Sequence, residues 1–258
     1  MQTGKDAIMI KRVIRTAAVL LLVFSEGAGA ADKLGSEALV TGLVGHAQVF
    51  AKDRPDGRAV KMGDRLGKDQ EVRVGEHSRI EIRFPDGTVM RLSEKTRLAM
   101  NEVRYDSKTE SKSVNVNLGI GKLWANVRKL VTADSSVEVK TVNAVAGVRG
   151  TVYRVNVEED RSALVRVYDG SVYVANPPRD ASQPLDKISA PREVAGPHPV
   201  PPPYHEVTRE EWTAIVSAMQ QITISPQGVP SKPQDFDPKS DADDWVKWNQ
   251  ERDKQVPL

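Results

Sequence analysis

Residues 79–88 read RIEIRFPDGT, and this stretch decides the fold class. Its alternate positions, Ile80, Ile82 and Phe84, are apolar, while the residues between them are charged. Successive side chains of a strand point to opposite faces, so this period of two predicts a half-buried strand. Asp86 and Gly87 then predict a tight turn, because glycine tolerates positive φ and aspartate hydrogen-bonds to nearby backbone.

The same pattern continues on both sides of this stretch, from Ala38 to Ala175. Further alternation occurs at 113–118, 137–141, 152–157, 165–167 and 172–174. Turn residues separate these segments at 53–57, 119–121, 134–136, 158–161 and 169–170. Strands at this spacing, with loops too short for helical crossovers, predict an all-β domain of about a dozen short strands, mainly antiparallel. The spacing leaves a sandwich, a roll and a solenoid open.

The N-terminus has the pattern of a secretory signal over residues 1–30. Lys11, Arg12 and Arg15 precede the uncharged run 16–24, and small residues follow at 28–30. This pattern predicts export to the periplasm with cleavage between Ala30 and Ala31. The run is too short to span the ~30 Å of a bilayer, so no stable membrane span is expected after cleavage.

Two further segments follow the predicted β-domain of residues 31–176. Residues 177–205 are rich in proline, which predicts an extended linker. In the acidic tail, 206–258, Thr208 and Glu211 form a capping box that predicts a helix over 209–221, and Ser240 with Asp243 predicts a second. Both helices are expected to pack on the β-domain. The proposed docking residues are Trp212, Trp245 and Trp248.

Charge and composition exclude several classes of function. Residues 1–30 hold four basic and two acidic side chains, so the net charge of +2 falls to zero without them. No basic surplus remains for nucleic-acid binding. Tail residues 206–258 hold ten acids and six bases, whereas the β-region is net positive. Cysteine is absent, which excludes disulfides, thiolate metal sites and thiol nucleophiles.

The segment 146–151, AGVRGT, is the most distinctive motif. A strand and not a helix follows it, so it fits neither a phosphate loop nor a dinucleotide site. We interpret Gly147, Gly150 and Thr151 as a sharp turn that holds Arg149 against a carboxylate or backbone carbonyls. Arg149 is thus expected to be important mainly for the fold.

Together with blocks before and after it, this motif resembles the signature of FecR-domain proteins. The similar blocks, in order, are 42–44, 62–64, Gly75 with Ser78, 84–88, 118–124 (which includes Trp124), 139–141, 147–153 and 167–172. In its best-known members the family joins a cytoplasmic anti-sigma segment and a transmembrane helix to a periplasmic domain that senses a ferric-siderophore transporter. This chain is expected to lack the first two parts. The resemblance therefore implies a stand-alone exported module that recognises an envelope protein.

Other readings of the sequence are weaker. No cofactor or metal site is expected: the four histidines have no ligand spacing, and Asp235, Asp237, Asp241, Asp243 and Asp244 lack an EF-hand register. A carbohydrate-binding module would use Trp124, Tyr153 and Tyr168 if they share an exposed face. A hydrolase could use a pair from Asp64, Glu81 and Asp86. We expect a binding module that is not an enzyme.

Overall fold

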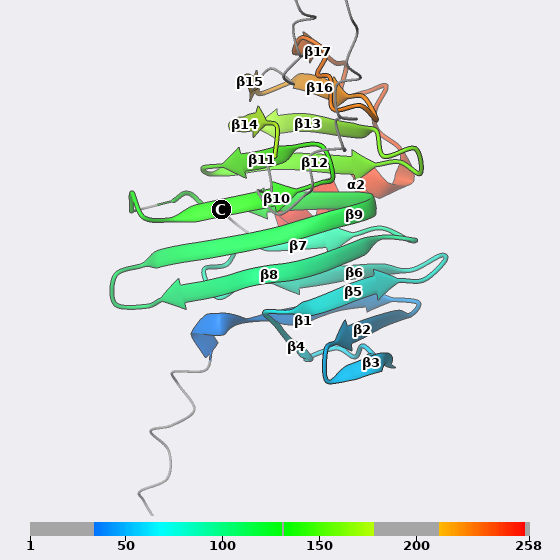
Figure 1. The fold of residues 1–258 in the computed structure, drawn as a ribbon, viewed down its shortest axis with the longest axis vertical. Helices are drawn as coiled ribbons and strands as arrows, with labels where there is room; N and C mark the ends of the chain where they lie inside the picture. Colours follow the sequence, from blue (N-terminus) through cyan, green and yellow to red (C-terminus); the bar gives the residue numbers. More distant parts are fainter. Residues whose placement is uncertain (1–33, 131, 178–211, 256–258) are drawn as a thin grey trace, which may run out of the picture.

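Two stacked β-sheets make up the body of the protein in a computed structural model that describes residues 34–130, 132–177 and 212–255 (Figure 1). Sheet A contains, in spatial order, β4 (Arg65–Gly67), β1 (Glu37–Val44), β6 (Arg79–Arg83), β7 (Val89–Leu92), the second part of β9 (Ser111–Val127), β12 (Thr151–Val157), β13 (Ala163–Asp169), β16 (Gln220–Ile224) and β17 (Gln234–Asp235). Sheet B contains β3 (Arg54–Ala59), β2 (Ala47–Ala51), β5 (Gln70–Val74), β8 (Arg97–Asp106), the first part of β9, β10 (Ser136–Lys140), β11 (Val145–Val148), β14 (Ser171–Ala175) and β15 (Thr213–Ser217).

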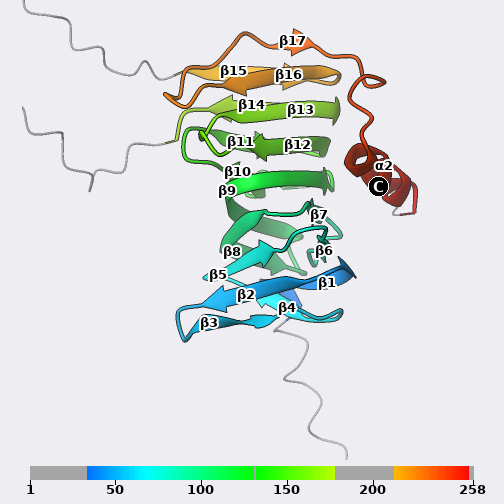
Figure 2. The ribbon, with the colours of Figure 1, turned by 90° about the vertical axis from the view of Figure 1, so that its right-hand side faces the viewer.

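The chain moves from one sheet to the other after every one or two strands and advances along the long axis (Figure 2). All the pairings are antiparallel except that of β9 with β10, which is parallel. The prediction of an all-β domain is confirmed. A short 3-10 helix, η1 (Leu34–Ser36), and one α-helix, α2 (Asp244–Lys254), complete the described part.

Strand β9 belongs to both sheets. It crosses sheet B, bends at Gly121 and returns across sheet A, so that its two ends lie at the same edge of the stack. Gly121 has a φ of +99°, and a Cβ there would lie 2.6 Å from the Cα of Thr96. Only glycine fits such a bend without strain. The turn predicted at 119–121 is therefore a bend within one strand.

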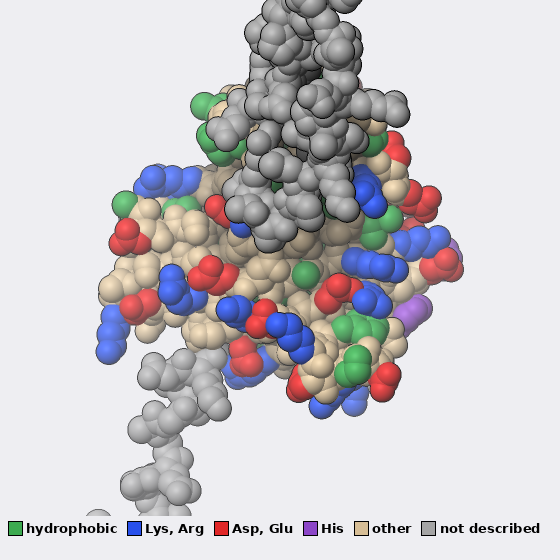
Figure 3. Space-filling view, viewed as in Figure 1, with side chains coloured by type: hydrophobic (Ala, Val, Ile, Leu, Met, Phe, Trp, Pro, Cys, Tyr) green, Lys and Arg blue, Asp and Glu red, His purple; other side chains and the backbone are tan. Residues whose placement is uncertain are grey.

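The hydrophobic core lies between the two sheets. Ile80 and Ile82 of sheet A and Val114 and Val116 of sheet B belong to one buried cluster. These are the apolar positions of the alternating segments, so the period of two assigns the inner face correctly. On the front of the stack, basic and acidic side chains are interspersed with no broad basic area on the visible part (Figure 3).

The helix predicted over 209–221 is wrong. Residues 213–217 and 220–224 form β15 and β16, joined by a turn in which Met219 has a φ of +62°. β15 extends sheet B beside β14, and β16 extends sheet A beside β13. The edges of the two sheets recruit this β-branched segment, so both sheets continue beyond the boundary predicted at residue 176. Residues 54–57 likewise begin β3 and do not form the predicted turn.

The second predicted helix exists as α2, but its cap is three residues later than expected. Asp243 is the N-cap residue, and its carboxylate accepts a hydrogen bond of 2.7 Å from the backbone N–H of Val246. Within the described ranges no helix is long and apolar enough to cross a bilayer. The predicted signal, residues 1–30, and the linker beyond Pro177 lie outside the described residues.

Candidate recognition site

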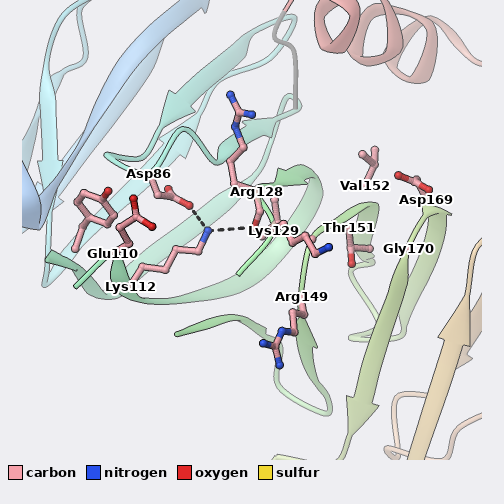
Figure 4. A pocket seen from close by; sticks show the side chains of 13 residues that line it. Asp86, Glu110, Lys112, Arg128, Lys129, Arg149, Thr151, Val152, Asp169 and Gly170 are labelled. Atoms are coloured by element: carbon pink, nitrogen blue, oxygen red, sulfur yellow. Dashed lines mark hydrogen bonds and ion pairs between the residues drawn. The ribbon is translucent and has the colours of Figure 1, made fainter. Parts of the chain in front are cut away.

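Four of the predicted motif residues, Asp86, Arg149, Gly150 and Thr151, line a cavity of about 740 Å³ beside the edge where both ends of β9 meet (Figure 4). Turns between successive strands build it: β6–β7 supplies Asp86, β11–β12 supplies Arg149 and Gly150, and β13–β14 supplies Gly170. Thr151, the first residue of β12, also lines the cavity. The fold thus brings together blocks that are up to 84 residues apart in the sequence.

A buried ion pair forms one wall of the cavity. The Nζ of Lys112 donates a hydrogen bond to Asp86, and the two side chains are only 4% and 8% exposed. Lys112 also donates to the carbonyl of Arg128 over 3.1 Å. The carboxylate of Asp86 accepts a 2.6 Å bond from the Thr88 hydroxyl, which fixes the turn. This network ties the β6–β7 turn to both ends of β9.

Three cationic side chains, Arg128, Lys129 and Arg149, also line the cavity. None of the three makes a side-chain ion pair within the described residues. Arg149 is exposed, so it is not held in the way that the sequence reading expected. Figure 4 shows the guanidinium groups of Arg128 and Arg149 pointing away from each other. The cations are spread around the cavity and do not converge on one point.

Two glycines give the cavity its shape. Gly150 has a φ of +75°, and a Cβ there would lie 3.0 Å from the Cα of Lys129. Gly170 has a φ of +82°, and its Cβ would lie 2.7 Å from the carbonyl oxygen of Gly150. Side chains at these positions would force the two turns apart. Gly147 does not line the cavity; it lies in β11 opposite Tyr173.

Trp124 lies elsewhere, in a row of polar and aromatic residues on the outer face of sheet A. The row runs directly across five neighbouring strands, in the order Glu81, Arg91, Trp124, Arg154 and Arg166. We call this row the outer ladder. Glu81, Arg91 and Trp124 are no more than 1% exposed, because α2 covers them. The period of two assigns Glu81 to solvent, so the sequence, although it indicates Trp124 and a docked tail, does not predict this row of charged residues.

The C-terminal segment places carboxylates on the arginines of the outer ladder. Asp241, just before α2, accepts hydrogen bonds from Arg154, Arg166 and the hydroxyl of Tyr168. Asp253, near the end of α2, accepts a 2.6 Å bond from Arg91 and a 2.9 Å bond from Trp124 Nε1. Like charges directly opposite each other destabilise a sheet, and Asp241 bridges the one such pair in the ladder.

At Glu81 the charges are reversed, because the sheet supplies the carboxylate and α2 supplies the arginine. Its carboxylate accepts 2.7 Å bonds from Arg91, from Arg252 of α2 and from the hydroxyl of Thr41. Burial by itself would raise the pKa of Glu81, but the hydrogen bonds from Arg252, Arg91 and Thr41 outweigh it and lower the pKa to about 2. The same contact raises the pKa of Arg252. Glu81 is therefore ionised at neutral pH.

The three tryptophans proposed for docking lie in two places. Trp245 and Trp248 of α2 stack with ring centroids 5.4 Å apart and belong to the cluster that contains Trp124. Trp212 lies instead before β15, where it packs on the main core and its Nε1 donates a 3.0 Å bond to the carbonyl of Gly228. It does not sit on a helix.

The structure gives no support to the alternative sites. Trp124 and Tyr153 are 1% and 0% exposed, so they cannot stack on a sugar. Asp64, Glu81 and Asp86 each pair with different cations, and no two of them share a partner. Within the described residues no group of His, Asp and Glu side chains could hold a metal ion.

Comparisons with known proteins agree with the resemblance seen in the sequence. Residues 70–173 match the model of the family described as FecR protein. Two crystal structures of a "putative anti-sigma factor" from Parabacteroides distasonis ATCC 8503, at 1.65 Å and 2.50 Å, align with 65% of the chain at 21% and 20% identity and a TM-score of 0.43. The chain spans 60% of the length of those structures. No curated protein matches it. The matched range contains both ends of β9 and the motif 146–151, so this part of the chain is similar to a FecR domain.

Proposed function

We propose that the protein is a binding and signalling module of the bacterial cell envelope that works by protein recognition and is not an enzyme. The match to the FecR family supports a role in signalling. The observation that carries the proposal is the set of cationic side chains around the cavity, Arg128, Lys129 and Arg149, which have no ion-pair partner in the described part.

The arrangement of these cations favours a protein partner over a small ligand. A small anion would be bound by donors that converge on one point, whereas Arg128 and Arg149 point apart (Figure 4). Exposed acids, Glu110 and Asp169, line the same cavity. A protein surface with charges of both signs can match such a pattern, and these contacts would set specificity and association rate.

The proposed location is the periplasm, with the chain cleaved before Ala31. It rests on the basic, apolar and small-residue pattern of residues 1–30. In this compartment the partner would be an envelope protein.

A crosslinking pulldown tests the proposal. Tagged protein is expressed with its native leader, and the recovered chain is weighed by intact-mass spectrometry. We expect a chain that starts at Ala31 and one reproducible envelope protein, whose recovery falls at least about tenfold in the double variant Lys129→Glu/Arg149→Glu.

The matched control is Arg97→Glu, an exposed arginine on β8 that does not line the cavity. If the double variant and the control recover equal amounts of the envelope protein, the cavity is not the binding site. No partner from any variant, or an uncleaved cytosolic chain, would overturn it.

A further inference from the structure

Several polar atoms at the contact between the outer ladder and α2 lack a hydrogen-bond partner. Arg91 Nη2, Arg154 Nε, Trp245 Nε1 and Asn249 Oδ1 are buried there without a hydrogen-bond partner. A buried polar atom without a partner costs free energy, and buried ion pairs often contribute little net stability. The contact between α2 and sheet A thus combines a small aromatic cluster with a buried polar network that is incompletely satisfied.

The helix also contributes nothing to the main core. The core cluster between the sheets contains no residue of α2, and both sheets complete their strand pairing without it. An isolated helix of 11 residues is marginal in water. α2 therefore depends on the sheet for its stability, whereas the strand pairing of the sheet is complete without α2, and this asymmetry is the condition for a local opening.

An opened face would be basic and aromatic. It carries three arginines, Arg91, Arg154 and Arg166, against the single carboxylate of Glu81. Residues 237–255, which cover it, hold six acids and four bases. Residues 237–255 thus show which groups this face binds. They place two separated carboxylates, Asp241 and Asp253, on it, with tryptophans between them.

We propose that the outer ladder is a docking surface for an acidic segment of a partner protein that ends in an amphipathic helix, and that residues 237–255 occupy this surface until such a segment displaces them. This inference rests on the proposed function of protein recognition, but it concerns a different face from the cavity. The charge complementarity between the ladder and residues 237–255 carries it. The partner segment needs one carboxylate before its helix for Arg154 and Arg166, and a second within the helix for Arg91.

A peptide of residues 237–255 with a fluorescent label is the probe, and the full-length chain is the receptor. Asp241→Asn/Asp253→Asn weakens the chain's own α2 and leaves the ladder unchanged. Because the attached helix competes at high effective concentration, we expect the probe to bind this variant at least about tenfold more tightly than the wild type. The matched control is Asp244→Asn, since Asp244 is exposed on the same helix and does not contact the ladder. A probe that carries Asp241→Asn/Asp253→Asn should not bind.

Equal binding to wild type and variant, or equal binding by the Asn-substituted probe, would overturn the proposal. If the variant does not fold, hydrogen exchange of the wild type replaces the binding experiment. Backbone amides of α2 should then exchange at least about tenfold faster than those of β12. Equal exchange rates would overturn the proposal. If the wild type is a dimer that the probe dissociates, α2 of a second copy occupies the outer ladder. That result would overturn the proposal of a partner protein. None of these results depends on the pulldown partner or on Arg149.

Discussion

The indole Nε1 of Trp124 donates a 2.9 Å hydrogen bond to the carboxylate of Asp253, across 129 residues of chain. The bond joins the middle of the stack to the end of α2. Trp124 also lies against Tyr168, with ring centroids 4.5 Å apart, so the indole is held by packing on one side and by hydrogen bonding on the other.

Replacing Trp124 tests this bond. Trp124→Phe keeps most of the ring but leaves a carboxylate oxygen of Asp253 without its donor, so the free energy of unfolding should fall by about 1–3 kcal/mol in urea titrations. Trp245→Phe is the comparison, because its buried Nε1 has no partner to lose. A cost for Trp245→Phe equal to that for Trp124→Phe would show that ring volume, not the hydrogen bond, is responsible.

The bend of β9 gives a second prediction. Gly121→Ala places a Cβ 2.6 Å from the Cα of Thr96 at a φ of +99°, so it should lower the free energy of unfolding by more than about 1 kcal/mol. Gly119→Ala, two residues earlier, meets nothing closer than 3.9 Å. Thermal melts of the two variants should therefore differ, and equal melting temperatures would contradict the bend.

The Lys112–Asp86 pair gives a third. Asp86→Asn leaves the buried ammonium of Lys112 without a counter-ion, and losing one partner of a buried pair costs about 3–5 kcal/mol. Asp64→Asn breaks the more exposed pair with Arg58 and should cost at most about 1 kcal/mol. Chemical denaturation of both variants makes the comparison; similar losses would show that burial does not matter here.

Acid should release α2 before the sheets unfold. The pKa of Glu81 is about 2 in the folded protein and 4.5 ordinarily, so the contribution of Glu81 is complete above pH 4.5 and is lost as the pH falls toward 2. Protonation weakens the bonds from Arg91 and Arg252. Three of the four tryptophans lie at this interface, so Trp212→Phe leaves only reporters of α2.

Fluorescence of that variant should therefore change in this pH window while the far-ultraviolet circular dichroism of the strands is retained. If the two signals change together at every pH, α2 does not open separately from the sheets.

The sequence predicts the inner face of the fold well, because burial between two sheets requires the alternation of residues such as Ile80 and Ile82. It could not predict the outer ladder: Glu81 and Arg91 look like solvent positions until a helix from the other end of the chain covers them. The available signals were the opposite charges of the β-region and the tail and the tryptophans of the second predicted helix, Trp245 and Trp248.

The error at 209–221 has a similar origin. Trp212, Ile215, Val216 and Met219 fit a helical period, but the β-branched residues among them also fit a strand once β14 offers an open edge. Asp86, Gly150 and Thr151 were identified as a set from their motifs. Their meeting at one cavity follows from the return of β9, which no local pattern specifies.

That return of β9 also divides the molecule. Every strand pairing between the part before β9 and the part after it passes through β9, so this strand is a seam between two halves. The segment at the C-terminus crosses the same seam on the outside: Arg252 and Asp253 hold Glu81 and Arg91 on one side, and Asp241 holds Arg154 and Arg166 on the other. α2 with Asp241 thus connects the two halves a second time, and without it β9 would be their one connection through strand pairing.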